Sequence, residues 1–383
     1  MGTTYSSRRK LRILWLPHNS WGVGRYQRDQ YFIDRLCCHH TLHVATWSDF
    51  LPHRITTFIN PAAYLHSLRS HKYTQGGYTV HHLPRLPGVL AALSQSRLGP
   101  DALNRKLFIR AVERIIREEK IDLIVSAQSL GRGRFLCPFI FDYVDSCGFL
   151  SRSDQKCLEE ADRVLCVSER LMAKVIPHNR KAHLLPNGAD LKKMRIGTGE
   201  RVREKYRLGS DRVVSLIGLT FSQDLYFLEA IEIARRRLPN LKCLLVGKSE
   251  LLERALVRFK GPENGLVYTG PVPYSEIQDY FAASDVGLYP GDDSEFFQAA
   301  SPIKIFEYTA ARKYVVSSRL EEMEKLGWGN LVFAEPSGNS FAEGILTALK
   351  LMESRQFPAT TVAEYDWDTL TRKLEELLQE SQG

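Results

Sequence analysis

The sequence of 383 residues lacks an apolar run long enough to cross a bilayer. Its first ten residues are polar and basic, and the apolar run 11–17 that follows is too short for a signal-peptide core. Cys-x-x-Cys pairs are also missing, and an odd count of seven cysteines fits reduced thiols better than disulfides or a zinc site. We therefore expect a cytoplasmic protein without a structural metal.

A Gly-x-Gly-x-x-Gly fingerprint is missing as well. The loop after the first apolar run carries Gly22 and Gly24, but position 27 is Gln rather than Gly. An NAD-dependent enzyme would share the same kind of α/β sheet, since a fold alone does not name a function. The missing fingerprint argues against it.

The excess of basic over acidic residues lies in the N-terminal third of the chain. Residues 1–120 hold 18 Lys and Arg against 7 Asp and Glu, whereas the remainder holds 34 against 37. Such a surface attracts anionic lipid headgroups, a lipid-diphosphate acceptor or nucleic acid, although a solvated basic face gives the same count. Because no nucleic-acid recognition motif is present, we expect no specific nucleic-acid partner, and peripheral contact with an anionic membrane stays open.

Apolar runs alternate with helical patterns in both halves of the chain, which predicts two doubly wound parallel sheets. A polar stretch, 192–211, separates the halves. Helices are expected at 25–37, 101–120, 225–238 and 274–283. Strands are expected at 11–17, 121–126, 139–145, 161–168, 213–218, 241–247, 267–272, 286–290 and 314–317.

The most informative segment is Ser301-Pro302-Ile303-Lys304-Ile305-Phe306-Glu307-Tyr308. Ser301 is expected to cap a helix whose first residue is Pro302. The amides of Ile303 and Lys304 then lack intrahelical acceptors and lie at the positive end of the helix dipole, which suits a phosphate.

Lys304 adds a mobile positive charge, and Glu307 lies on the same face of the helix three residues later. A carboxylate that accepts two hydrogen bonds is what a ribose diol needs. This spacing therefore predicts a site for a nucleoside diphosphate, while an ordinary surface Lys-Glu pair remains the alternative.

The residues that follow, Ala310-Ala311-Arg312-Lys313 and then the apolar run 314–317, resemble retaining glycosyltransferases of the GT-B fold. The motif is most similar to family-4 glycosyltransferases of the subgroup with a Ser-Pro-x-Lys-x-Phe-Glu-Tyr motif in surface-polysaccharide assembly. The resemblance implies two Rossmann-like domains facing a cleft. The acceptor domain would cover 1–195, joined by a last helix at 366–383, and the donor domain 196–365.

In this family the donor is a nucleoside-diphosphate sugar, here with UDP or GDP, and no metal or other cofactor is needed. The resemblance implies that the leaving diphosphate is held by Lys304 and the start of its helix, with Lys248 as a further cation. Gly218 and the backbone near Val272 would contact the donor. Glu307 would hold the ribose.

On the acceptor side, Asp142 and Asp145 close a predicted strand, and ligands of α/β folds bind at such strand ends. The resembled subgroup makes Asp145 the first choice to orient the acceptor hydroxyl and Asp142 the second, while capping of the next helix is the alternative. The loop after the first strand offers further candidates, although ordinary packing is the alternative for each: His18, Trp21, Gly22 and Arg25.

Several positions depart from the family. The Glu eight residues before Glu307 is replaced by Ala299, so that Glu295 or Gln298 would have to replace it. The Arg and Lys after the first strand of the second domain are missing, and Arg312 stands where a Gly normally follows the helix. The sequence therefore supports two hypotheses: a retaining glycosyltransferase with an unidentified acceptor, or a catalytically silent GT-B protein that binds a nucleotide or a partner.

Overall fold

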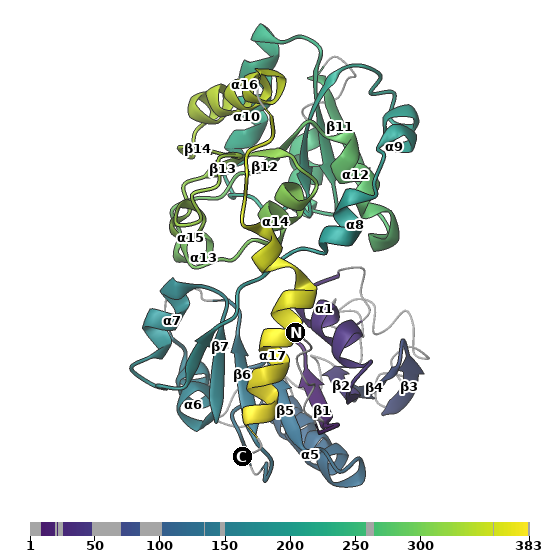
Figure 1. Ribbon diagram of the computed structural model, residues 1–383, viewed down its shortest axis with the longest axis vertical. Coiled ribbons are helices and arrows are strands. Elements are labelled where there is room, and N and C mark those ends of the chain that lie inside the picture. The colour runs from purple at the N-terminus through teal and green to yellow at the C-terminus, as the bar shows by residue number, and fades with distance from the viewer. Residues whose placement is uncertain are drawn as a thin grey trace, which may run out of the picture.

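The computed structural model describes residues 9–19, 21, 26–47, 70–84, 102–133, 135–145, 150–257, 264–354 and 356–381. Two α/β domains are stacked along the long axis of the molecule (Figure 1). Each contains a mainly parallel sheet with helices packed against it, which confirms the predicted pair of Rossmann-like domains.

Within the described ranges, eight strands of the first domain form a sheet in the order β3-β4-β2-β1-β5-β6-β7-β8. All neighbours are parallel except the β3–β4 hairpin. The strands are β1 (Arg12–Leu16), β2 (Thr41–Trp47), β3 (His71–Gln75), β4 (Tyr78–Leu83), β5 (Leu123–Ser126), β6 (Phe139–Tyr143), β7 (Arg163–Cys166) and β8 (Ala182–Leu184). The helices are α1 (Arg28–Leu36), α5 (Ala102–Glu118), α6 (Arg152–Glu160) and α7 (Glu169–Val175).

Strands β2, β3 and β4 were not predicted. Histidines interrupt their apolar pattern, and β3 is mostly exposed. One signal was available, because Gly76 and Gly77 form a two-residue turn with φ of +57° and +90° between β3 and β4. A Gly-Gly pair between two potential strands is typical of a β-hairpin.

The second domain has six strands among the described residues, in the order β11-β10-β9-β12-β13-β14. This is the doubly wound order in which ligands bind beyond the carboxyl ends of the central strands. The strands are β9 (Arg212–Ile217), β10 (Leu241–Val246), β11 (Leu266–Gly270), β12 (Val286–Tyr289), β13 (Tyr314–Ser318) and β14 (Leu331–Ala334). The helices are α8 (Leu191–Arg195), α9 (Glu200–Lys205), α10 (Tyr226–Arg237), α11 (Glu250–Leu256), α12 (Ile277–Ala283), α13 (Glu295–Gln298), α14 (Ile303–Ala310), α15 (Glu321–Glu324) and α16 (Gly338–Ser354), with 3-10 turns η3 (Tyr274–Glu276) and η4 (Val362–Tyr365).

The last helix, α17 (Trp367–Glu380), follows the second domain but packs on the first (Figure 1). Trp367 is fully buried and stacks on Tyr31 of α1 with ring centroids 4.6 Å apart. Leu370 and Leu374, one and two turns further along, are also fully buried in the same apolar cluster. The apolar face of α17 therefore packs on the first domain, so that the chain returns to this domain after it has completed the second.

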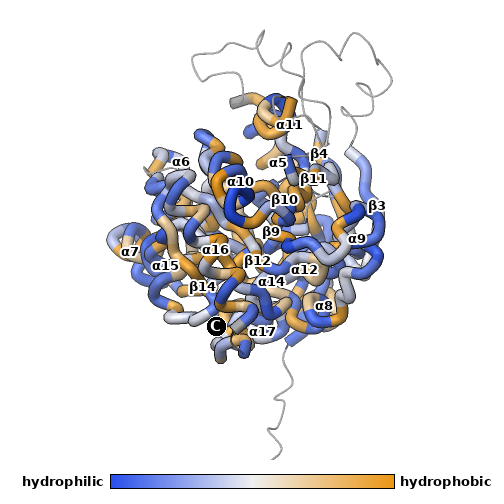
Figure 2. Tube along the Cα trace, turned by 90° about the horizontal axis from the view of Figure 1, so that it is seen from above, coloured by the Kyte–Doolittle hydropathy of each residue, from blue (hydrophilic) through white to orange (hydrophobic). Residues whose placement is uncertain are grey.

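Figure 2 shows polar and apolar positions alternating along α10, α11 and α16, as expected for helices with one buried face. Every helix within the described ranges is too short or too polar to cross a bilayer.

Arg312 keeps the left-handed conformation of the glycine that it replaces, with φ of +59°. A side chain in this region costs about 1–2 kcal/mol. The guanidinium lies 5.4 Å from the ring centroid of Phe357, a cation–π distance that offsets part of this cost. The turn after α14 therefore retains its shape.

Candidate functional site

Helix α14 begins at Ile303, one residue later than predicted, with Pro302 at the N-cap position. The hydroxyl of Ser301 does not cap the helix; its Oγ accepts a hydrogen bond of 3.0 Å from the Asn187 amide. The Ser301 carbonyl accepts a second one, of 2.7 Å, from Asn187 Nδ2. Ser301 therefore ties α14 to the first domain and is buried there, which does not fit its prediction as a donor-binding cap. The amides of Ile303 and Lys304 belong to the first turn of α14, where the backbone supplies no intrahelical acceptor for them.

Lys304 and Glu307 form an ion pair on this helix. Lys304 Nζ lies 2.6 Å from Glu307 Oε2, and the Glu307 side chain is fully buried. The lysine stem passes over Gly218 at the end of β9, where an added Cβ would lie 2.7 Å from Lys304 Cε. Gly218 also has φ of +88°, so glycine is required here for both backbone shape and space. The structure thus brings three predicted donor residues together.

A tyrosine of the first domain forms a hydrogen bond with the other carboxylate oxygen of Glu307. Tyr31 of α1 donates a hydrogen bond of 3.0 Å to Glu307 Oε1. Its oxygen also lies 2.5 Å from the hydroxyl of Tyr274, which belongs to the second domain. Burial raises the pKa of Tyr31 well above its ordinary value, so the hydroxyl keeps its proton and acts as a donor. Sequence reasoning missed Tyr31, because nothing local marks it.

Aromatic stacking closes the interface around this contact. Tyr26 stacks on Tyr274 with ring centroids 4.0 Å apart and planes 4° from parallel. Lys193 Nζ lies 3.9 Å from the centroid of the same Tyr274 ring. Ile303 at the start of α14 packs against the apolar cluster of the first domain. The two domains are therefore in direct contact over the predicted ribose carboxylate.

Two other predicted donor residues, Lys248 and Val272, follow neighbouring strands of the second domain. Lys248, after β10, is exposed and lines a hollow with residues of α11, and none of the contacts described for it involves Lys304 or Glu307. Val272, after β11, is half-buried against the core. Because β9, β10 and β11 are parallel neighbours, both residues still follow strand ends on the same edge as Gly218.

His18 and Asp145 meet at the corresponding edge of the first sheet. His18 Nε2 lies 3.2 Å from Asp145 Oδ2, and both side chains are partly exposed. The hydrogen bond with Asp145 raises the pKa of His18 above 6.5 despite its partial burial. The Asp145 charge in turn contributes to a raised pKa of Tyr289, a β12 residue whose pKa is raised mainly by burial. This predicted acceptor pair therefore lies at the strand ends of the first sheet, near enough to β12 for the Asp145 charge to act on Tyr289.

Asp142 and Trp21 do not fit their predicted acceptor roles. Asp142 is buried, and its carboxylate binds Arg28 of α1 through contacts of 2.9 and 3.1 Å. Trp21 is buried and packs edge-on against Tyr78. The remaining predicted loop residues, Gly22 and Arg25, lie outside the described part of the chain.

Arg28 was not predicted, yet it holds the segment of the first domain that contacts the second. Its Nη1 donates to the Pro186 carbonyl at 3.1 Å and to Asn187 Oδ1 at 3.2 Å. Asn187 in turn holds Ser301, so a chain of hydrogen bonds runs from Asp142 to the start of α14. A buried cation shared in this way helps to fix the position of α14 relative to the first domain.

Neither residue proposed to replace the missing glutamate is available. Ala299 is buried among residues of the first domain, and its carbonyl accepts a hydrogen bond of 2.7 Å from Ser168 Oγ. Gln298 is engaged by the backbone of Arg319 and Glu321. Glu295 accepts hydrogen bonds from Arg170 and Lys174 of α7. Among the described residues, neither candidate therefore supplies a free carboxylate at this position.

Acid should weaken the contact between α13 and α7. The hydrogen bonds from Arg170 hold the pKa of Glu295 at about 2, below its ordinary 4.5. Its contribution to stability is therefore present above pH 4.5 and is lost as the pH falls through about 2. We expect Glu295→Gln to lower the unfolding midpoint by about 2–4 °C at neutral pH and by progressively less below pH 4.5, measured by calorimetry.

The matched control for this prediction is Glu343→Gln, because Glu343 forms an exposed ion pair with Arg237 inside the second domain. A Glu295→Gln difference that stays constant between pH 7 and pH 2 would contradict the assignment.

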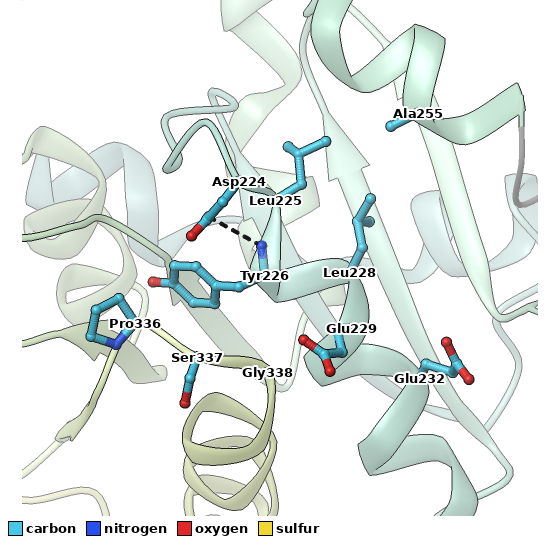
Figure 3. A pocket seen from close by; sticks show the side chains of 10 residues that line it. All are labelled: Asp224, Leu225, Tyr226, Leu228, Glu229, Glu232, Ala255, Pro336, Ser337 and Gly338. Carbon is cyan, nitrogen blue, oxygen red and sulfur yellow. Dashed lines mark hydrogen bonds between the residues drawn. The ribbon is translucent and has the colours of Figure 1, made fainter.

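An open pocket of about 540 Å³ lies where α10 and α16 begin (Figure 3). Its lining includes the carboxylates of Asp224, Glu229 and Glu232. Asp224 accepts a hydrogen bond of 3.3 Å from the Tyr226 amide, and Glu229 lies against Gly338. An acidic lining repels a diphosphate, so this pocket does not compete with α14 as the donor site.

Comparison with known proteins agrees with this geometry. Residues 213–350 match a family model described as "Glycosyl transferases group 1". TuaH of Bacillus subtilis (strain 168), named provisionally as a teichuronic acid biosynthesis glycosyltransferase, is 25% identical over 185 residues. The alignment covers 46% of this chain and 45% of TuaH, so the chain spans about half the length of the curated relative that it matches. These findings support a glycosyltransferase of group 1.

Solved structures similar to the chain share its whole architecture. Trehalose-phosphate synthase from Burkholderia xenovorans has a TM-score of 0.72 at 12% identity, covering 97% of this chain and 100% of that one. Sucrose-phosphate synthase from Thermosynechococcus elongatus has 0.70 at 14%, covering 97% and 99%. HepE from Anabaena, solved with UDP-glucose, has 0.64 at 17%, covering 97% and 100%. The fold is therefore GT-B.

Proposed function

We propose that this chain is a retaining glycosyltransferase that transfers a sugar from a UDP-sugar to the hydroxyl of a polysaccharide, lipid-linked or small-molecule acceptor. The observation that carries the proposal is the group of Gly218, Lys304 and Glu307 at the strand ends of a domain that matches group 1 glycosyltransferases. The choice of UDP is supported by the structural neighbour solved with UDP-glucose.

The donor half of the reaction needs the negative charge of the leaving diphosphate to be held. Lys304 Nζ and the first-turn amides of α14 supply one mobile charge and fixed dipoles for this purpose without a metal. Glu307 would accept hydrogen bonds from the ribose hydroxyls once its hydrogen bond from Tyr31 has been broken.

The acceptor half would take place at His18 and Asp145, a partly exposed pair at the strand ends of the first sheet. The bond between the anomeric carbon and the phosphate oxygen breaks, and a bond from the acceptor oxygen forms on the same face of the sugar. The acceptor proton goes to the leaving phosphate, so no side-chain base is required. Asp145 would orient the acceptor hydroxyl.

A second candidate, a catalytically silent nucleotide-binding protein, is favoured by one observation. The position of the family's donor-sugar glutamate is filled by Ala299, and both potential replacements bind other groups. Such a protein would bind UDP at α14 but would neither transfer nor hydrolyse a UDP-sugar.

Calorimetric titration with UDP, GDP and NAD, followed by a UDP-release assay with UDP-sugars, tests both candidates. We expect saturable binding of UDP, weaker binding of GDP and none of NAD, with slow release of UDP from one donor. UDP binding without any turnover, with or without saccharide acceptors, would support the silent protein. Failure to bind any nucleoside diphosphate would overturn both.

We also propose that α5 contacts an anionic membrane. Lys106, Arg110 and Arg117 are exposed on this helix and form no ion pair among the described residues. Each basic residue near such a surface contributes about 1 kcal/mol. Changing all three to Gln should weaken binding to phosphatidylglycerol vesicles by about 100-fold in co-sedimentation.

The control variant changes three exposed cations of the second domain, Lys205, Arg236 and Arg254, to Gln. Equal losses for the two triple variants, or binding insensitive to salt, would contradict a role for α5.

A further inference from the structure

Two buried histidines lie side by side in the sheet of the first domain. His43 of β2 and His81 of β4 are 4% and 7% exposed, and His43 Nδ1 lies 3.1 Å from His81 Nε2. Glu119, directly after α5, brings a carboxylate oxygen to the same place, and the three potential ligand atoms lie within 4.8 Å of one another. This cluster takes no part in the donor or acceptor site described above.

The strand register explains why the two imidazoles meet. His81 is paired with Ala45, two residues after His43 on the neighbouring parallel strand, so both rings project from the same face. Ala45 belongs to the apolar cluster formed with α5, which places this face under the helix that leads to Glu119. His82, the next residue, projects to the opposite face and stacks on His71.

The two facing ring nitrogens can share only one proton in a hydrogen bond. When a metal ion takes the place of that proton, His43 Nδ1 and His81 Nε2 can both act as ligands, whereas His43 Nε2 lies across the ring from this contact and has no hydrogen-bond partner among the described residues. A neutral imidazole with a free lone pair is the commonest protein ligand for transition metals. Two nitrogens bound to one tetrahedral zinc at the usual bond length are about 3.3 Å apart, close to the separation seen here.

The cations near Glu119 do not block such a site. Lys72 Nζ lies 3.2 Å from Glu119 Oε1, but the Lys72 side chain is 66% exposed. Arg12 is 3.9 Å from the other oxygen and 41% exposed. Lys72 can turn into solvent at little cost, because exposed ion pairs contribute little. Arg12 is also held by a hydrogen bond from its Nε to the Glu119 carbonyl, but its Nη2 stays 3.9 Å from the carboxylate.

We propose that His43, His81 and Glu119 bind one divalent transition-metal ion of the zinc class, with solvent as a further ligand. The ion would join β2, β4 and the end of α5. His43 lies near the start of β2, and Glu119 contacts Arg12 at the start of β1. The site is thus at the amino edge of the sheet, away from the substrate groups, and its role is structural. The expectation of no structural metal rested on cysteine spacing, which does not report on histidines of separate strands.

The test is titration of the metal-free full-length protein with Zn²⁺ by calorimetry and with Co²⁺ by visible absorption. We expect one ion per chain with the intense absorption of tetrahedral cobalt, and a rise of about 5 °C or more in the unfolding midpoint at saturating zinc. His81→Gln should weaken binding about 100-fold or more. Lys72→Met should strengthen it, because it frees Glu119 from competition.

The matched control is His82→Gln, one residue away on the opposite face, which should bind metal like the wild type. Equal losses for His82→Gln and His81→Gln would show that binding does not depend on the face that carries His43 and His81, and would overturn the proposal. The absence of tetrahedral cobalt absorption in the folded wild type would overturn it as well. Circular dichroism of each variant separates lost binding from lost folding.

Discussion

Glu307→Gln should weaken UDP binding by about 100-fold, as measured by calorimetry. The ribose diol would donate two hydrogen bonds to this carboxylate, and bonds to a charged acceptor contribute about 1.5–3 kcal/mol each. Glutamine keeps the shape of the side chain but retains one acceptor oxygen and loses the charge. The variant also weakens the contact with Tyr31, which makes the interface easier to open and offsets part of the loss.

The control for this experiment is Glu335→Gln, which removes an exposed carboxylate of the same domain that pairs with Arg319. It should bind UDP normally. Unchanged UDP affinity in a folded Glu307→Gln protein would place the ribose elsewhere and remove the main support for the donor site.

Lys304→Met should lower kcat with a UDP-sugar by about 1000-fold, with a much smaller change in UDP affinity. The charge of the leaving diphosphate develops in the transition state, so its stabiliser acts mainly on kcat. Removing one preorganised group of this kind typically costs a factor of about 100–1000. Methionine keeps the apolar stem that lies over Gly218.

Two further variants sharpen this prediction. Gly218→Ala should reproduce much of the kcat loss while Lys304 is present, because the new Cβ would lie 2.7 Å from Lys304 Cε. Lys248→Met should have little effect, since Lys248 is exposed beside α11. A kcat loss for Lys248→Met as large as that for Lys304→Met would contradict the assignment of Lys304.

The elements that could be predicted from the sequence are those whose own residues form a recognisable local pattern. The strands β9 to β13 are short, continuously apolar runs with polar or glycine punctuation, and α14 begins within one residue of its predicted start. Lys304 and Glu307 are neighbours on one helix, so their contact follows from spacing alone. At Arg312, where the resembled family has a glycine, the sequence left open whether the turn is remodelled, and its left-handed φ of +59° shows that the turn is kept.

Contacts between distant segments were not predictable in this way. Tyr31 meets Glu307 across 276 positions, and Arg28 meets Asp142 across 114. Asp142 has the same strand-end position as Asp145, and only packing decides that one is buried against an arginine while the other stays exposed. Ser301 is a residue type that often caps helices, but its hydroxyl accepts a hydrogen bond from the Asn187 backbone amide instead.

If α14 binds the donor as proposed, the contact between Tyr31 and Glu307 would make nucleotide affinity depend on how often the domains separate. Glu307 is fully buried while this contact is made, so only molecules that have broken it could bind a ribose there. The measured dissociation constant is then the intrinsic one divided by the open fraction, and an open fraction of about 1% would weaken it about 100-fold. At high nucleotide concentration, the rate of association would be limited by the rate at which the domains open. Any acceptor or surface that holds the domains apart would raise the affinity for the donor without contacting the donor.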